Sequence, residues 1–204
     1  MPVVAVPSVP EIRLHKAGPR SGLWRLAELD REFGSPYWAH YWGGGLALAR
    51  YLLDRPDTVA GRRILDLGAG SGIVAIAAAK AGAREVIAAD IDRYAIAAIG
   101  LNAKENDVEV SPFLGDPTTG PPLAVDIVAV GDLFYDRDLA ARVTAFLDQC
   151  LACGIEVLIG DPWRAFLPLS RLRLLAEYLV SEFGDPGIGA TKRAAVFSFE
   201  RDGK

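Results

Sequence analysis

The chain has 204 residues, of which 51% are hydrophobic and 24% charged, and its 22 basic and 26 acidic side chains give a net charge of −4. This composition is typical of one folded domain, and without a basic block we expect no binding of nucleic acid. No apolar run reaches the roughly 18 residues of a membrane span, and two cysteines are too few for a disulfide framework, so we expect a cytoplasmic protein without a membrane partner.

The N-terminal part of the chain precedes the regular pattern. Its early prolines fix the backbone and remove hydrogen-bond donors, which predicts an extended or irregular segment over residues 1–20. A helix is predicted over residues 22–33, followed by the aromatic connector YWAHYW (37–42). Three glycines (43–45) then lead into a second helix, because the apolar residues of LALARYLLD (46–54) keep helical spacing.

From residue 62 on, short apolar runs alternate with helical patterns. The predicted strands lie in residues 62–67, 85–90, 108–116, 125–130 and 156–161, and the predicted helices in 72–83, 93–106 and 136–153. Apolar strands that alternate with helices indicate a parallel sheet covered on both faces.

The C-terminal part breaks this alternation. A short helical stretch is predicted around residues 165–176, followed by two β-rich runs, 177–183 and 193–200. With no helix between them, these runs should pair antiparallel, joined by residues 185–192. The pattern predicts a Rossmann-like α/β fold with a seven-stranded, mostly parallel sheet, an antiparallel last strand and helices on both faces. This is the arrangement of class I methyltransferases, which use S-adenosylmethionine (SAM).

The stretch ILDLGAGSG (64–72) has the form of a ligand-binding loop between a strand and a helix. It does not match the dinucleotide fingerprint G-x-G-x-x-G, because Ile73 stands at the third glycine position, and it lacks the lysine of a phosphate-binding P-loop. Asp66 ends the strand, where a carboxylate repels pyrophosphate and attracts a cation. SAM has no phosphate and carries an ammonium and a sulfonium, so the motif favours SAM. The alternative is a tight turn without a ligand.

Further aspartates follow the next strands. Asp90 ends the second predicted strand, where an acidic residue holds the ribose hydroxyls of NAD and SAM alike. Asp92 lies one step into the turn, and we interpret it as the cap of the next helix. Asp116 follows the third strand at the expected position of the adenine amino group, and a turn aspartate before Pro117 is the open alternative.

The acceptor site is expected where the fourth strand runs into GDLFYDRD (131–138), at the switch point of the sheet. Asp132 is the first catalytic candidate, since a carboxylate orients an amine and accepts its proton. Tyr135 is the second candidate and would shape the acceptor site. The alternatives are that Asp132 caps the next helix and that Phe134 and Tyr135 only pack beneath the loop.

Five segments carry a resemblance to a known family. They are VPEIRLH (9–15), PYWAHYWGGGLALARYLL (36–53), LDLGAGSG (65–72), GDLFYD (131–136) and GDPWRAFLP (160–168). Together they resemble the lysine methyltransferases of the electron-transfer-flavoprotein β-subunit, seven-strand enzymes often labelled "nicotinamide N-methyltransferase-like". Many methyltransferases share the glycine loop, whereas GDLFYD and GDP-x-R are more selective.

This resemblance extends over nearly the whole chain and carries specific expectations. It implies a SAM-dependent enzyme whose acceptor is a lysine of a protein, the flavoprotein β-subunit. It also implies that Trp42 borders the SAM pocket and that Asp132 faces the target lysine. One departure is the segment DREFGSPYW (30–38), which is short and leaves the identity of the substrate open.

The expected site combines these residues with a two-part chain. Residues 1–45 would form an N-terminal extension that is part of a lid over substrate and cofactor, and residues 46–204 the SAM-binding domain. No metal site is expected, because His15 and His40 are too few and too far apart. The expected cofactor-binding residues are Trp42, Asp66, Gly68, Gly70, Ser71, Gly72, Asp90, Ile91 and Asp116.

Several alternatives stay open at this point. Asp161 and Arg164 follow the fifth strand and are either functional or a local ion pair, while Cys150 and Cys153 are expected to be packing residues. The rival functions are a small-molecule N-methyltransferase acting on a pyridine or amine, and a SAM-binding module without chemistry. A nicotinamide-dinucleotide dehydrogenase is the most distant rival, because Asp66 opposes a pyrophosphate.

Overall fold

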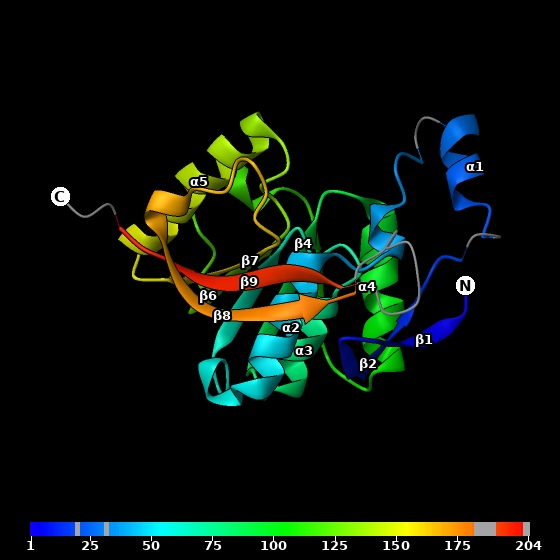
Figure 1. Cartoon of the computed structure of the whole chain (residues 1–204), viewed down its shortest axis with the longest axis horizontal. Coiled ribbons are helices and arrows are strands. Elements are labelled where there is room, and N and C mark those ends of the chain that lie inside the picture. Colours follow the sequence, from blue (N-terminus) through cyan, green and yellow to red (C-terminus); the bar gives the residue numbers. More distant parts are fainter. Residues whose placement is uncertain (19–20, 31–32, 182–190, 202–204) are drawn as a thin grey trace.

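The computed structural model describes residues 1–18, 21–30, 33–181 and 191–201 (Figure 1). Its centre is a seven-stranded sheet with the strand order β5-β4-β3-β6-β7-β9-β8. Five strands run parallel as predicted: β3 (Arg63–Leu67), β4 (Glu85–Asp90), β5 (Ser111–Leu114), β6 (Ile127–Gly131) and β7 (Glu156–Asp161). β9 (Lys192–Phe199) runs antiparallel to both of its neighbours, β7 and β8 (Leu172–Val180), which confirms the predicted fold class.

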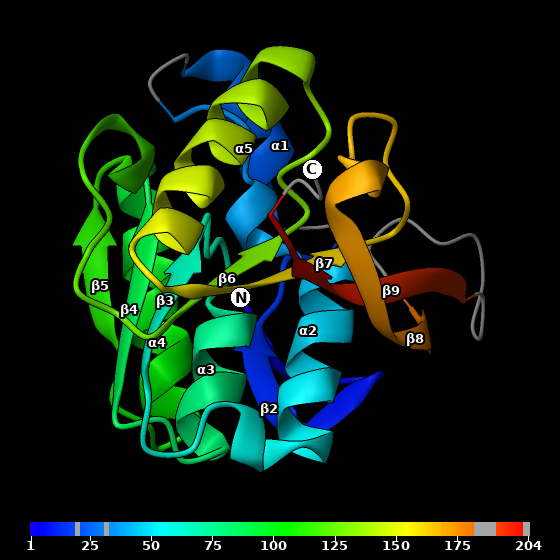
Figure 2. The same ribbon diagram turned by 90° about the vertical axis from the view of Figure 1, so that its left-hand side faces the viewer.

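Helices cover both faces of this sheet (Figure 2). One face carries α2 (Gly43–Asp54), α3 (Ile73–Lys80) and α4 (Arg93–Glu105), and the other carries α5 (Arg137–Ala152). Alternate residues of a strand point to opposite faces, so Ile64 joins the core beneath α2, α3 and α4, whereas Leu65 joins the core beneath α5. Asp66 shares the face of Ile64, which directs its carboxylate toward α3.

The first fifteen residues are better ordered than the sequence predicts. β1 (Val3–Val6) and β2 (Val9–His15) pair as an antiparallel hairpin, where only an extended or irregular segment was expected. Val9, Ile12 and Leu14 are buried in the core beneath α2, α3 and α4. The hairpin forms because this apolar side of β2 has a helical layer to cover, a contact that local sequence does not encode.

Two asparagines, Asn102 in α4 and Asn106 directly after its end, hold β2 in place. The Asn106 amide accepts a hydrogen bond from the Arg13 backbone N–H at 3.0 Å and returns one to the Arg13 carbonyl at 2.6 Å. Asn102 accepts one from the His15 backbone N–H at 2.8 Å. The Asn102 amide also donates to the Ser71 carbonyl at 2.8 Å, so one fully buried side chain joins the hairpin to the glycine loop.

Two predicted helices differ from the structure. α1 (Leu23–Leu29) is shorter than the predicted helix over residues 22–33, of which residues 31–32 lie outside the described residues. The helix predicted around residues 165–176 is wrong, because this part contains only a 3₁₀ turn (Leu169–Arg171) and the start of β8. The ladder hydrogen bonds to β9 outweigh the helix propensity of its Leu, Arg and Ala residues. The predicted connection 185–192 lies mostly outside the described residues. In the described part of the chain, no helix is both long and apolar enough to cross a bilayer.

α2 begins earlier than predicted, because Gly43–Gly45 form its first turn instead of leading into it. Here the helix touches the end of β7 with its backbone. A Cβ atom on Gly44 would lie 2.1 Å from the Gly160 carbonyl oxygen, and one on Gly160 would lie 2.2 Å from the Gly44 carbonyl oxygen. Only glycine at both positions permits this approach, which places the N-terminus of α2 over the carboxyl ends of β6 and β7.

We therefore expect Gly44→Ala to destabilise the protein by about 2–4 kcal/mol, since two backbones must separate to admit one methyl group. Gly100→Ala is the matched control. Gly100 lies within α4 with nothing within 4 Å of its would-be Cβ atom, so alanine should stabilise the protein by about 0.5–1 kcal/mol. Urea unfolding of both variants measures the difference, and equal midpoints would contradict the close backbone contact.

Candidate active site

A cavity of about 600 Å³ lies at the carboxyl ends of the strands, next to β3 and β6. These two neighbouring strands form the switch point of the sheet, because the strands that follow β3 and those that follow β6 are added on opposite sides. Its volume is within the range of roughly 300–1,000 Å³ typical of cofactor sites. Nearly all residues predicted for the site line it: Trp42, Asp66, Gly68, Gly70, Ser71, Asp90, Ile91, Asp116, Asp132 and Tyr135. Gly72 does not line it and instead precedes α3, with its α-carbon turned to Ile99.

The glycine loop adopts a conformation that suits glycine at each of its three positions. Gly68, Gly70 and Gly72 have φ values of 71°, 52° and 80°, in the left-handed region. The loop is fixed by hydrogen bonds from the backbone N–H groups of Gly68 and Ala69 to the Ala89 carbonyl, at 3.0 and 2.9 Å. A Cβ atom on Gly68 would meet the Leu133 side chain at 2.7 Å, so the glycine loop packs directly against the loop that follows β6.

Asp66 is a buried carboxylate with one hydrogen bond of its own. Its Oδ2 accepts from the Ala75 backbone N–H in α3 at 3.0 Å, and the residue is 1% exposed. Burial raises the pKa of Asp66 from 3.8 to about 7, the hydrogen bond from Ala75 opposes this rise, and the nearby charge of Asp90 adds to it. A cation in the cavity would stabilise the ionised carboxylate, which is the role predicted for the end of this strand.

Asp90 faces the same cavity but is already held by three donors. Oδ2 accepts from the Gly70 backbone N–H at 2.8 Å, while Oδ1 accepts from the Tyr37 hydroxyl at 2.6 Å and from the Asp92 backbone N–H at 3.1 Å. Burial, followed by the Asp90 charge, raises the pKa of Tyr37 far above its usual range. Tyr37 is a site residue that the sequence does not predict, because YWAHYW (37–42) indicates only an aromatic connector. The sequence feature that could have indicated Tyr37 is its hydroxyl-bearing aromatic ring in the same segment as Trp42, which lines the same cavity.

Asp92, Ile91 and Asp116 complete the cofactor side. The prediction for Asp92 is confirmed, because its side chain caps α4 through the Tyr94 backbone N–H at 2.7 Å. Ile91 is 72% exposed at the rim of the cavity. Asp116 makes the alternative turn as well as lining the cavity: Oδ1 accepts from the backbone N–H and the hydroxyl of Thr118, and Oδ2 lies 3.5 Å from Arg142.

On the acceptor side, Asp132 has an unusual backbone and two strong partners. Its φ is 61°, its Oδ2 accepts from the Gly45 backbone N–H at 2.8 Å, and its Oδ1 accepts from Arg164 Nη2 at 2.8 Å. Asp132 therefore caps the start of α2, which precedes it in the sequence. The alternative that it caps the next helix, α5, is wrong. The cap of α5 is Asp136.

The rest of the loop after β6 separates into a buried and an exposed aromatic. Phe134 is fully buried, as the packing alternative expects, whereas Tyr135 is 60% exposed and lines the cavity. Tyr135 is thus available to a molecule that approaches Asp132 from outside.

Asp161 and Arg164 form the ion pair that the sequence left open, and Arg164 also reaches the cavity. The Arg164 backbone N–H donates to Asp161 Oδ1 at 2.6 Å, and Arg164 Nε lies 3.9 Å from Asp161 Oδ2. Asp161 is fully buried, and burial raises its pKa to about 6. The arginine that contacts Asp132 is a second residue that sequence reasoning did not assign, although GDPWRAFLP was among the selective segments.

The remaining candidates take structural positions. Both cysteines are free thiols: Cys150 is buried in the core beneath α5, as expected of a packing residue, whereas the same expectation is wrong for Cys153, which is exposed just after the end of α5. Trp24 stacks on His40 with ring centroids 6.1 Å apart. Within the described parts of the chain, no group of three or more His, Cys, Asp or Glu side chains could hold a metal ion.

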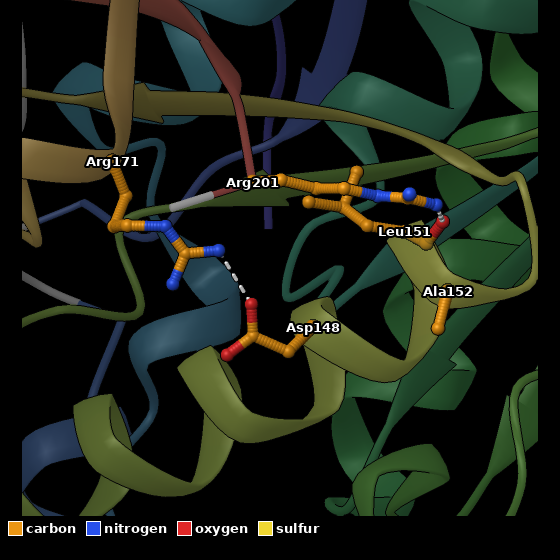
Figure 3. A pocket seen from close by; sticks show the side chains of 5 residues that line it. All are labelled: Asp148, Leu151, Ala152, Arg171 and Arg201. Atoms are coloured by element: carbon orange, nitrogen blue, oxygen red, sulfur yellow. Dashed lines mark hydrogen bonds and ion pairs between the residues drawn. The ribbon is translucent and has the colours of Figure 1, made fainter. Parts of the chain in front are cut away.

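A second hollow, of about 500 Å³, lies at the C-terminal end of α5 (Figure 3). Its charged side chains are used locally: Arg171 pairs with Asp148 at 2.5 Å, and Arg201 donates to the Leu151 carbonyl at 2.8 Å. It shares no residue with the cavity at the strand ends, and no catalytic candidate lines it. The chemistry therefore belongs to the cavity at the strand ends.

The residues of that cavity fit SAM. A buried carboxylate with a raised pKa suits a ligand that carries positive charge near the end of β3, and Asp90 next to a glycine loop suits a ribose. The loop offers no lysine for phosphate. Asp132 and Tyr135 stand on the far side of the glycine loop, where an acceptor would meet the methyl group.

Comparison with known proteins gives several extensive matches. A family model for ribosomal protein L11 methyltransferase (PrmA) matches residues 48–129. The electron transfer flavoprotein beta subunit lysine methyltransferase of Rattus norvegicus is 41% identical over 93% of this chain and 77% of its own length. The same protein of Xenopus laevis is 40% identical over 95% of this chain and 81% of its own length.

Solved structures show the same fold at lower identity. The ribosomal protein L11 methylase from Lactobacillus delbrueckii subsp. bulgaricus has a TM-score of 0.55 and 20% identity, covering 79% of this chain and 82% of its own. The T. thermophilus 16S rRNA N2 G1207 methyltransferase (RsmC), solved with AdoMet and guanosine, has a TM-score of 0.57 and 20% identity, covering 79% of this chain and 44% of its own.

The raised pKa of Asp66 predicts a pH-dependent affinity for SAM. Because a cationic ligand favours the ionised carboxylate, the dissociation constant should rise as the pH falls below about 7, by up to about tenfold per pH unit. Calorimetric titration with SAM measures this, and an affinity that stays flat through this range would contradict it.

Asp66→Asn provides the complementary test. The ordinary pKa is 3.8 and the folded one about 7, so the folded protein loses stability from this group as the pH rises through 7. At about pH 8 the asparagine variant should therefore melt at a higher temperature than the parent without SAM, and should gain little when SAM is added. A variant that still gains the full SAM-induced shift would show that Asp66 does not face the cation.

Proposed function

This chain belongs to the family of the electron transfer flavoprotein β-subunit lysine methyltransferases, and we propose that it transfers the methyl group of SAM to lysine side chains of that β-subunit. The observation that carries the proposal is the single cavity shared by the two carboxylates of the glycine-loop side and by Asp132. The proposal is also supported by the two relatives, whose alignments with this chain extend over more than nine-tenths of its length.

On the cofactor side, each group has a separate task. Asp66 would balance the charge of the methionyl ammonium, and the Asp90 carboxylate, oriented by Gly70, would hold the ribose hydroxyls. Tyr37 and Trp42 line the cavity from the segment that precedes α2. They support the proposal that residues 1–45 contribute part of a lid over substrate and cofactor.

On the acceptor side, Asp132 would orient the lysine nitrogen toward the methyl carbon. Bound SAM supplies an electrophilic methyl on a positively charged sulfur. The lysine must present a neutral amine, because an ammonium has no lone pair. The lysine would first give its proton to water, and as the N–C bond formed the C–S bond would break with its electron pair going to sulfur, leaving the product as a methylammonium. Asp132 contributes mainly by position, since both of its oxygens are held at 2.8 Å.

The specific partner and the cellular location rest on the family and the composition. Ser35 and Tyr37, which belong to the short segment DREFGSPYW (30–38), line the cavity, so we propose that recognition of the substrate differs among relatives at these two residues. We propose a cytoplasmic location from the low cysteine content.

We expect the purified protein to methylate the electron transfer flavoprotein of the same organism on lysine, with SAM carrying a labelled methyl group. Asp132→Asn should lower kcat/KM by about 10²–10³, because the charge that orients the amine is lost while a hydrogen bond to Gly45 can persist. Asp148→Asn, at the second hollow, is the control and should retain activity. Gel autoradiography and mass spectrometry of the acceptor locate the label.

The same assay separates the rival functions. Label in nicotinamide or another pyridine, with a small effect of Asp132→Asn, would replace the protein substrate with a small molecule, because a pyridine nitrogen needs no deprotonation. SAM binding without labelled product from cell extract would indicate a binding module.

A further inference from the structure

We propose that Arg164 is a positioning residue of the methyl transfer: it locks the Asp132 carboxylate in place and supplies the positive charge that keeps the acceptor lysine unprotonated. This inference rests on the proposed lysine methyltransferase function and concerns a residue outside the glycine loop and outside GDLFYD.

The geometry of Asp132 leaves it little freedom. The α2 backbone holds Oδ2 through Gly45, and the guanidinium holds Oδ1, each at 2.8 Å. The side chain of Asp132 is 10% exposed and that of Arg164 26% exposed, so both stand at the inner wall of the cavity. A carboxylate held at both oxygens by charged or dipolar donors is a fixed anion and a weak proton acceptor.

Arg164 is in turn held by a strained turn. Trp163, one residue earlier, has a φ of 65°, a conformation that is costly for a bulky side chain. The buried Asp161 carboxylate fixes this turn through the Arg164 backbone N–H at 2.6 Å. The result is that the Trp163 side chain is 43% exposed, while Arg164 points inward to Asp132. Such an arrangement is retained where the turn must place one side chain accurately.

The local charges explain why the arginine matters. The groups that face Asp132 include the positive N-terminal end of α2, the Arg164 guanidinium and, behind the guanidinium, the Asp161 carboxylate. Without Arg164, two neighbouring carboxylates would be left with little compensation, and a lysine beside them would stay an ammonium. With Arg164, and with the sulfonium of SAM, the charge of the two carboxylates is balanced, so they no longer hold the acceptor lysine as an ammonium. The lysine then gives its proton to water and presents its lone pair to the methyl carbon.

The test compares Arg164→Gln, Arg164→Lys and the control Arg173→Gln, whose parent residue is 60% exposed and pairs with Glu200 on the surface. The flavoprotein is the acceptor, and kcat and KM for the acceptor and SAM are measured from about pH 6 to about pH 10. For Arg164→Gln we expect kcat to fall by about 10- to 100-fold and the acid limb of the pH profile to move up by about one pH unit, with KM for SAM little changed. Arg164→Lys should keep the limb near its original position and recover most of kcat.

The outcomes are distinct. An acid limb that stays in place for Arg164→Gln, or one that moves to lower pH because a freed Asp132 acts as a base, overturns the proposal. So does a lysine variant as slow as the glutamine variant. If the parent protein labels no flavoprotein at all, the proposed substrate has failed, and carbon-13 NMR titration of Asp132 still decides the inference. Its protonation midpoint should move to higher pH in Arg164→Gln, and an unchanged midpoint rejects the role of Arg164. Melting curves of all three variants exclude unfolding as the cause.

Discussion

The backbone contact between the first turn of α2 and the end of β7 is the constraint on which the site depends. Gly44 and Gly160 approach so closely that neither tolerates a methyl group, and the Asp132 backbone N–H donates to the carbonyl of Gly160 at 3.1 Å. This contact brings the N–H of Gly45 within hydrogen-bond distance of the Asp132 carboxylate. A helix N-terminus is thus placed over the acceptor carboxylate, and its partial positive charge stabilises the anion before any ligand arrives. The helix also carries Trp42 at its start, at the wall of the cavity.

The cofactor side shows the opposite electrostatic arrangement. Asp66 is buried with a single hydrogen bond, and its raised pKa means that the folded protein bears a cost for its charge at neutral pH. The negative charge of Asp132 is balanced by groups of the protein, whereas that of Asp66 would be balanced by a bound cation. The two carboxylates face one cavity but have different partners. Asp66 is therefore suited to bind the charged cofactor, and Asp132 to orient the acceptor.

Much of this site could be predicted because β3, β4, β6 and β7 are short apolar runs, each with an aspartate as its last or penultimate residue or directly after its end. Parallel strands bring their carboxyl ends to one edge, so Asp66, Asp90 and Asp132 had to converge. Residues whose role depends on distant contacts could not be assigned in this way. Tyr37 binds Asp90, which lies 53 residues later in the sequence, and Arg164 binds Asp132, which lies 32 residues earlier. The residues around Tyr37 and Arg164 do not indicate these partners. Gly43–Gly45 have poor helix propensity, and only the approach to Gly160 makes them the first turn of α2.

The strand order also constrains how the chain assembles during synthesis. β2 is made well before the asparagines that hold it, which follow 87 and 93 positions later, so the hairpin has to wait for α4 before its apolar side is covered. At the other end, β9 lies between β7 and β8, although β8 is made first. β8 therefore has no place in the sheet until β9 has been made, and the sheet cannot close before then. The protein is consequently most exposed to aggregation and to chaperones in the interval between the synthesis of β8 and that of β9.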